Sequence, residues 1–129
     1  MYAYNSSDFS AGRGFSAGWL YPYRTGKNIN ETLSVQYSSE QMQSAIIQAG
    51  LARHWVMTPA GPGVINGHLS QRGHTADIRV TYSPGHYSIN YLHSTNLLAK
   101  GNVIHRNYNN WIANLDQNIK LRLAALQIK

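Results

Sequence analysis

The sequence predicts an α+β domain in the order α-β-β-β-β-α, with an antiparallel sheet of three to four strands and two helices packed on one face. Apolar and polar residues alternate from His74 to Tyr82 and again from Tyr87 to Tyr91, which is typical of strands with one buried face. Between these runs, Pro84 and Gly85 favour a tight turn. In residues 102–126, apolar residues recur every three or four positions, which indicates a long amphipathic helix.

The strand register follows from the requirement that the apolar side chains share one face of the sheet. Residues 64–70 form the strand before His74, and Arg72 and Gly73 form a tight turn in which Gly supplies a positive φ angle, with Gln71 opposite His74. The pairs expected on the inner face are Tyr82–Tyr87, Val80–Ile89, Ile78–Tyr91, Leu69–Ala76 and Ile65–Val80. The pairs expected on the outer face are His68–Asp77 and Asn66–Arg79.

Ser38 and Gln41 mark the start of the first helix, because serine at the N-cap and glutamine three residues later form a capping box. The apolar stripe expected on this helix is Met42, Ala45, Ile46 and Ala49, and Gly50 ends the helix or packs closely. Before the helix, residues 32–36 are a short strand or an extended lead-in. After it, residues 54–57 form a short strand. Residues 58–63 form a loop, because two prolines and two glycines interrupt a strand ladder.

The last helix is predicted to begin near Asn102. Its apolar stripe is Ile104, Tyr108, Trp111, Ile112, Leu115, Ile119, Leu123 and Leu126. Residues 104–111 have two interpretations: a polar pocket between the helix start and the sheet, or an aromatic core stripe with a cation at its rim. The core stripe is favoured. Near the end, Leu121, Leu123, Leu126 and Ile128 exceed what a small sheet can cover, which indicates a self-association surface.

Residues 1–30 differ in composition from residues 31–129, which we interpret as a single domain. The first segment is rich in Gly, Ser and aromatic residues and has neither a helix nor a strand period, so it predicts a flexible arm that docks on a partner, or a disordered extension. The aromatic residues expected to dock are Phe9, Phe15, Trp19, Tyr21 and Tyr23. The chain has no 18-residue apolar run and no signal-peptide pattern, so no transmembrane segment is predicted.

The charge balance favours anionic partners. Eleven Lys and Arg residues against five acidic residues give a net charge of +6, which attracts nucleic acid or phosphate-bearing headgroups. The basic residues are scattered and form no run, so a generic solvated surface is ranked above a dedicated anionic or nucleic-acid site.

The residues that could carry chemistry do not combine into a catalytic or metal site. His68 is expected on the outer face of the sheet and His74 on the inner face, so they cannot share a metal ion. No two histidines are spaced to lie on the same face of a helix. The acidic residues show no evident pair for acid–base hydrolysis, and no nucleophile-elbow pattern occurs. We therefore expect no enzyme activity, no cofactor and no metal.

The candidate partner surface combines polar residues of the outer sheet face with the start of the last helix. It comprises His68, Asp77, Arg79, Asn90, His105 and Arg106. His68 and Asp77 are expected to form a hydrogen-bonded pair on this surface.

The chain contains the segments GHLSQRGHTADIRVTY at 67–82, YSINY at 87–91 and IHRNYNNWI at 104–112. Together they resemble a group of small proteobacterial lipoproteins, which are short envelope proteins of largely unassigned function. The resemblance covers residues 33–119 and implies a location in the cell envelope or periplasm, with no catalytic residues. Members of that group usually carry an N-terminal signal and a lipidated cysteine, and this sequence shows neither.

Two functional hypotheses remain open at this point. The first is a non-enzymatic envelope or secreted domain that binds or assembles with another envelope protein, or with itself. The alternative is a nucleic-acid-binding domain, because a helix, three antiparallel strands and a helix are also the order of the double-stranded-RNA-binding topology. The alternative is ranked lower because the start of the last helix offers only Lys100 and Arg106 for phosphate contacts.

Overall fold

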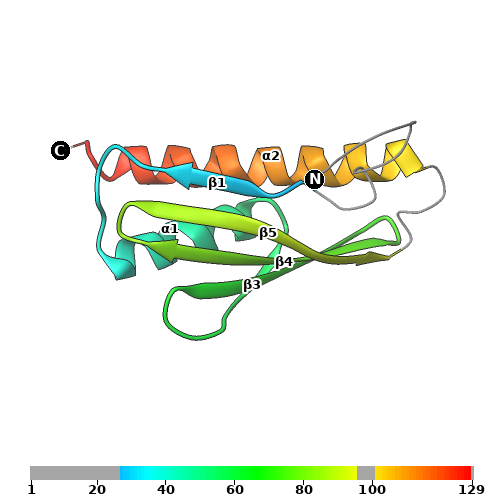
Figure 1. The fold of residues 1–129 in the computed structure, drawn as a ribbon, viewed down its shortest axis with the longest axis horizontal. Helices are drawn as coiled ribbons and strands as arrows, with labels where there is room; N and C mark the ends of the chain where they lie inside the picture. Colours follow the sequence, from blue (N-terminus) through cyan, green and yellow to red (C-terminus); the bar gives the residue numbers. More distant parts are fainter. Residues whose placement is uncertain (1–26, 96–100, 129) are drawn as a thin grey trace, which may run out of the picture.

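The computed structural model describes residues 27–95 and 101–128, apart from the side chains of residues 101–106. It shows an antiparallel sheet with two helices (Figure 1). The elements in chain order are β1 (Ile29–Thr32), α1 (Ser39–Ala52), β2 (Val56–Pro59), β3 (Val64–Gln71), β4 (His74–Ser83), β5 (His86–Thr95) and α2 (Gly101–Ala125). The α+β class is confirmed, but the sheet has five strands and not three to four.

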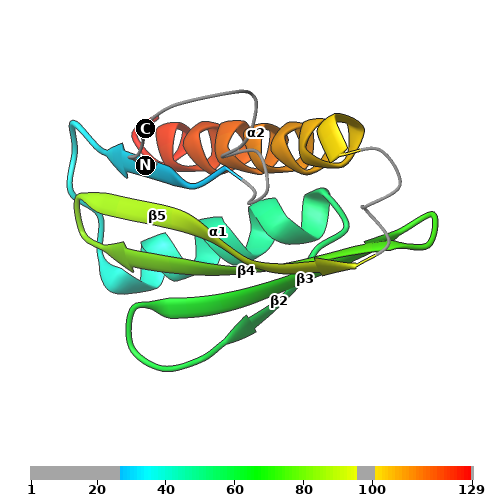
Figure 2. The same ribbon diagram turned by 45° about the vertical axis from the view of Figure 1, so that its right-hand side comes forward.

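The strand order across the sheet is β1-β5-β4-β3-β2. Strands β2 to β5 form a meander, and β1 adds to the free edge of β5 (Figure 2). The pairs predicted between β3 and β4, and between β4 and β5, are all confirmed. The demand that the apolar residues share one face was therefore sufficient to determine the register of three strands.

The first strand lies earlier in the chain than predicted. Of residues 32–36, which were predicted as a short strand or an extended lead-in, only Thr32 belongs to a strand; it ends β1, in which Ile29 pairs with Ile89 and Glu31 pairs with Tyr87. Beyond β1, the chain leaves the sheet, and the N–H of Leu33 donates to the carbonyl of Gly85 over 2.8 Å. β1 was missed because Ile29 is its single apolar residue, so its alternation is too short to detect.

A β-bulge interrupts the pairing of β4 with β5 between Asp77 and Ile78. Ile78 pairs with Tyr91, whereas Asp77 pairs with His93, so Leu92 is the extra residue on β5. Bulges bend a strand and increase its twist. The periodicity of the sequence did not predict this bulge, which brings His93 next to Asp77.

Helix α1 begins as predicted. The Ser38 side chain accepts a hydrogen bond from the N–H of Gln41 over 3.0 Å, and the Gln41 side chain accepts one from the N–H of Ser38 over 3.0 Å. Gly50 lies inside the helix, and a Cβ atom at this position would stand 2.3 Å from Cγ of Met57. The glycine therefore allows α1 to approach β2 closely.

Strand β2 differs from the prediction at both ends. It begins at Val56 and not at His54, and it continues to Pro59 within the range predicted as a loop. Pro59 pairs with Ile65. A proline is tolerated here because β2 is the last strand of the sheet, where an N–H that faces solvent is not needed for the ladder.

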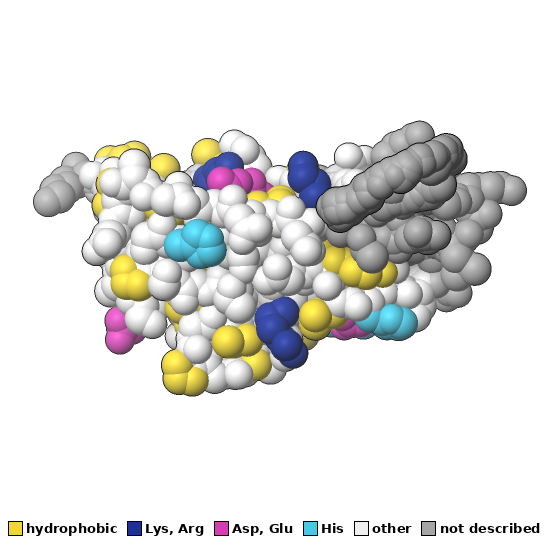
Figure 3. Space-filling model, in the orientation of Figure 1, with side chains coloured by type: hydrophobic (Ala, Val, Ile, Leu, Met, Phe, Trp, Pro, Cys, Tyr) yellow, Lys and Arg dark blue, Asp and Glu magenta, His cyan; other side chains and the backbone are white. Residues whose placement is uncertain are grey.

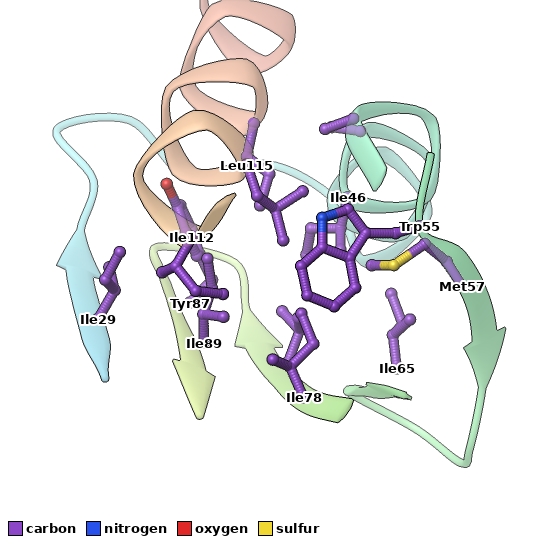
Figure 4. Close-up of a cluster of buried hydrophobic side chains, with 14 of the residues drawn as sticks. Ile29, Ile46, Trp55, Met57, Ile65, Ile78, Tyr87, Ile89, Ile112 and Leu115 are labelled. Carbon is purple, nitrogen blue, oxygen red and sulfur yellow. The ribbon is translucent and has the colours of Figure 1, made fainter. Parts of the chain in front are cut away.

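The core lies between the two helices and one face of the sheet. Figure 4 shows both helices on the same side of the inward-pointing residues, with the Trp55 indole between α1 and the sheet. Tyr87, Ile89 and Ile78 come from the sheet side, and Met42 and Ile112 come from the two helices. The predicted stripe of α1 is buried, and so are Tyr108, Ile112, Leu115, Ile119 and Leu123 of α2.

Neither helix of the described part covers the other face of the sheet, which we call the open face. Figure 3 shows it mostly covered by uncharged polar side chains and backbone, with few charged groups. Such a face needs no covering layer, because antiparallel sheets tolerate water on one side. Neither helix in the described part of the chain is long and apolar enough to cross a membrane.

Candidate functional site

The predicted pair on the open sheet face is confirmed. Nδ1 of His68 and Oδ1 of Asp77 are 2.8 Å apart, and both side chains are substantially exposed. An exposed pair of this kind contributes little to stability because water competes for both groups.

The other polar residues of the open face also bond to one another. Nε of Arg79 donates to Oδ1 of Asn66 over 3.0 Å, and Nδ2 of Asn90 donates to Oγ of Ser88 over 2.9 Å. Thus four residues of the candidate partner surface, His68, Asp77, Arg79 and Asn90, share one face on β3, β4 and β5. These side chains largely satisfy one another's hydrogen-bonding capacity. The face is therefore a solvated surface and not a preformed ligand site.

The remaining predicted partner residues lie outside the described side chains. They are His105 and Arg106 of α2 and the aromatic residues Phe9, Phe15, Trp19, Tyr21 and Tyr23 of the arm. Ile29 and Asn30, at the end of the range assigned to the arm, belong to β1. At the other end of the chain, Leu123 is buried, whereas Leu121, Leu126 and Ile128 are exposed. Self-association through them stays a prediction.

The structure brings together two carboxylates that the sequence did not pair. Nζ of Lys120 lies 2.8 Å from Oε2 of Glu31 and 3.2 Å from Oδ2 of Asp116. Asp116 also accepts a hydrogen bond from the hydroxyl of buried Tyr87, with Oδ1 at 2.5 Å. The sequence shows no evident pair because Glu31 reaches this cluster through β1, which its pattern did not reveal.

Two members of this cluster, Tyr87 and Lys120, keep their protons near neutral pH. Burial, followed by the hydrogen bond to Asp116, raises the pKa of Tyr87 far above its usual value of 10. The hydrogen bond with Glu31 is the main cause that raises the pKa of Lys120 above its usual value. Tyr87 therefore stays protonated and Lys120 stays charged. The cluster links β1, β5 and α2 and keeps its polar groups paired.

A cleft with a volume of about 310 Å³ opens between the end of α1, β3 and the middle of α2. We call it the tryptophan cleft because the side chains of Trp55 and Trp111 contribute to it. The described residues that line it are Ala52, Arg53, His54, Trp55, Leu69, Gln71, Trp111 and Asn114. Trp55 and Leu69 are buried, Trp111 is half-buried, and the polar residues are exposed. Aromatic surface with a few converging polar groups is typical of small-molecule sites.

The rim of the cleft is built by the turn that ends α1. The N–H of His54 donates to the carbonyl of Leu51 over 3.1 Å, and the N–H of Trp55 donates to that of Gly50 over 2.8 Å. This is a Schellman motif, in which the residue after the C-cap takes a left-handed conformation and is usually Gly. His54 takes that conformation here, with φ of 71°.

A second left-handed residue lies beside the same cleft. Arg72 has φ of 55° in the tight turn that follows Gln71, and Gln71 lines the cleft. In the described part of the chain, His54 and Arg72 are the two residues other than Gly with positive φ. Such conformations cost free energy in residues with a side chain and concentrate at functional sites.

The sequence pattern partly indicates this cleft. Residues 104–111 allowed two interpretations, a polar pocket or an aromatic core stripe. In the structure, Tyr108 is buried as a core residue, while Trp111 is half-buried and lines the cleft. His54 and Trp55 fall within the range predicted as a short strand, 54–57, but β2 begins only at Val56. The sequence feature that could have indicated the cleft is the end of α1, where His54 stands in place of the usual Gly and is followed directly by Trp55.

The chain matches no family model, no curated protein and no solved structure. Among the described residues, no three His, Asp or Glu side chains are arranged to hold a metal ion.

Proposed function

We propose that this chain is a non-enzymatic, small-molecule-binding domain of the bacterial cell envelope, or a secreted one, and that its ligand binds in the tryptophan cleft. The observation that carries this proposal is the composition of the cleft: the half-buried indole of Trp111, next to buried Trp55 and Leu69, together with the polar residues Arg53, His54, Gln71 and Asn114. Its volume of about 310 Å³ is at the lower end of the range for small-molecule sites, which suits a ligand of one ring or two.

The comparison between the two candidate surfaces supports the cleft over the open sheet face. On the open face, the polar side chains bond to one another, as Arg79 does with Asn66. In the cleft, aromatic surface and polar groups converge on a hollow, and the backbone of His54 is strained at its rim. Affinity comes mainly from concave, partly apolar sites where a ligand loses its contact with water.

The cellular location in this proposal comes from the resemblance of residues 33–119 to small proteobacterial lipoproteins. Fractionation of a producing bacterium, with antibodies against the domain, tests it. Recovery with envelope or periplasmic proteins is the expected result, and recovery with ribosomal and cytosolic markers would contradict it.

The ligand site is tested by two-dimensional ¹H–¹⁵N NMR spectra of the full chain, titrated with a panel of neutral and charged one-ring compounds. We expect the indole N–H signals of Trp55 and Trp111 to shift, and the signals of His68 and Asn90 on the open face to stay fixed. Trp111→Leu should abolish the shifts, whereas Arg79→Gln, a matched change on the open face, should not. Shifts confined to the open face would contradict the proposed site.

The nucleic-acid alternative has less support. The observed order adds β1 before α1 and β2 directly after it, whereas the double-stranded-RNA-binding topology has three strands between its helices. A duplex RNA titration at low salt is its test, because phosphate contacts weaken steeply with added salt.

A further inference from the structure

We propose that the ligand of the tryptophan cleft is a small organic anion, namely a ring compound that carries a carboxylate or a phosphate group. This inference rests on the proposed function and names the ligand class for the same site. Three features carry it: the charges around the cleft, its aromatic surface and the two strained residues beside it.

Among the described residues, the charged and hydrogen-bonding side chains at the cleft are basic or neutral. Arg53 and His54 line it, and Arg72 is the next residue after the lining residue Gln71. None of the described residues that line the cleft is acidic. A guanidinium group binds carboxylate and phosphate through two parallel hydrogen bonds, and an imidazole N–H adds another donor.

The acidic residues of the described part lie elsewhere. Glu31 and Asp116 share Lys120, and Asp77 pairs with His68. Glu40 is in the first turn of α1, about 20 Å along the helix from Arg53 at 1.5 Å per residue. That separation is about twice the screening length at 0.1 M salt. The cations at the cleft therefore keep a positive potential that attracts anions.

The end of α1 would oppose an anion if its last carbonyls were free, because the C-terminal end of a helix carries a partial negative charge. In this structure, the carbonyls of Gly50 and Leu51 accept hydrogen bonds from the N–H groups of Arg53, His54 and Trp55. These bonds reduce the exposed negative end, and Arg53 and His54 place positive or donor groups in front of it.

The remaining surface suits a ring. Trp111 is half-buried and provides indole surface, whereas Trp55 lines the cleft but is only 1% exposed. Flat rings pack on indole with more free energy than their area alone would give. Gln71 and Asn114 supply amide groups that both donate and accept hydrogen bonds.

The two left-handed residues support the same reading. Gly at either position, or Asn at Arg72, would adopt the observed backbone at a lower cost. Instead His54 and Arg72 hold basic side chains at the α1 end and at the β3–β4 turn. Strain retained at two sites beside one cleft points to the side chains as the reason for it.

The experiment is an NMR titration of the full chain at low salt with four probes: benzoate, phenyl phosphate, benzamide and inorganic phosphate. Benzoate and phenyl phosphate carry the ring and the charge, benzamide carries the ring alone, and inorganic phosphate carries the charge alone. We expect at least one of the two ring anions to bind about tenfold more tightly than both benzamide and inorganic phosphate. Whichever ring anion binds more tightly identifies the group as carboxylate or phosphate.

Variants identify the charge that is responsible. Arg53→Gln should remove the preference for ring anions over benzamide, and Arg72→Asn, which suits the left-handed backbone, should reduce it. Arg79→Gln on the open face is the matched control and should leave the preference unchanged. An unchanged preference in both Arg53→Gln and Arg72→Asn would overturn the assignment of the anion site to these cations.

The outcomes separate this inference from the proposed function. If benzamide shifts the Trp55 and Trp111 signals as tightly as the ring anions do, the cleft is a ligand site but the anionic class is wrong. If inorganic phosphate binds as tightly as the tighter of the two ring anions, the ring requirement is wrong. If none of the four probes shifts either indole signal at millimolar concentration, both the ligand class and the proposed site fail.

Discussion

The hydroxyl of Tyr87 donates a hydrogen bond of 2.5 Å to Oδ1 of Asp116, and this bond joins β5 to α2 inside an otherwise apolar interface. Lys120 then connects Asp116 to Glu31 of β1. A buried hydroxyl costs free energy unless it is bonded, so this contact determines how α2 sits on the sheet.

Tyr87→Phe should lower the free energy of unfolding by about 1.5–3 kcal/mol, because it removes a hydrogen bond to a charged acceptor and leaves part of Asp116 unsatisfied. Urea denaturation measures this change. Tyr82→Phe is the matched control, because Tyr82 is half-buried on the neighbouring strand. An equal effect of the two substitutions would show that the bond to Asp116 adds no stability.

Stability should fall as the pH rises above 10. Burial is the main cause that raises the pKa values of Tyr87 and Tyr108 above the ordinary value of 10. Above that pH, the unfolded chain loses these protons while the folded chain keeps them, so the free energy of unfolding decreases with pH. Below pH 10 both states are protonated, and these two groups cause no change.

Urea midpoints measured from pH 8 to pH 11 test this prediction. The decline should become shallower in Tyr87→Phe and in Tyr108→Phe, each compared with the wild type at the same pH. The Tyr108 hydroxyl is buried and has no hydrogen-bond partner among the described residues, so Tyr108→Phe should cost little stability at pH 8. A slope that is identical in all three proteins would contradict the assignment to these tyrosines.

His54→Gly should raise the free energy of unfolding by about 0.5–1 kcal/mol, because Gly adopts the left-handed conformation at the end of α1 without the penalty of a side chain. His54→Ala is the control, since Ala keeps the strain and should give no gain. Urea denaturation compares the two variants. Equal stability of the Gly and Ala variants would show that the backbone at position 54 carries no strain.

Gly50→Ala should destabilise the protein by about 1–3 kcal/mol, although Ala favours helices, because its Cβ would collide with Met57. In a Met57→Ala background the same substitution should be neutral or stabilising, since the obstacle is gone. A double-mutant cycle measures this coupling from the four proteins. Additive effects would contradict close packing of α1 on β2 as the reason for Gly50.

Much of the fold could be predicted from local patterns. The alternation in β3, β4 and β5 and the turns at Arg72 and Pro84 were sufficient for the register, because a shift by one residue would turn every apolar side chain to water. The capping box at Ser38 located the start of α1 to the residue. Pro59 misled the prediction of β2, because only its position at the sheet edge makes a proline acceptable there.

The candidate site was less predictable. Arg53, His54, Gln71 and Asn114 come from α1, β3 and α2 and their connections, and each alone looks like an ordinary surface residue. Trp111 fits a helical stripe equally well as a core residue or as the wall of a cleft. Only the packing of α2 against the end of α1 leaves it half-exposed.

The sequence by itself determined the α+β class, the strands and register of the central meander, the start of α1 and the apolar face of α2, because these depend on spacing along the chain and on turn chemistry. The tertiary structure decided the place of β1, the bulge at Asp77, the cluster of Tyr87, Asp116, Lys120 and Glu31, and the tryptophan cleft. These features join residues that are distant in the chain. Their contacts arise from how whole elements pack together, which no local periodicity records.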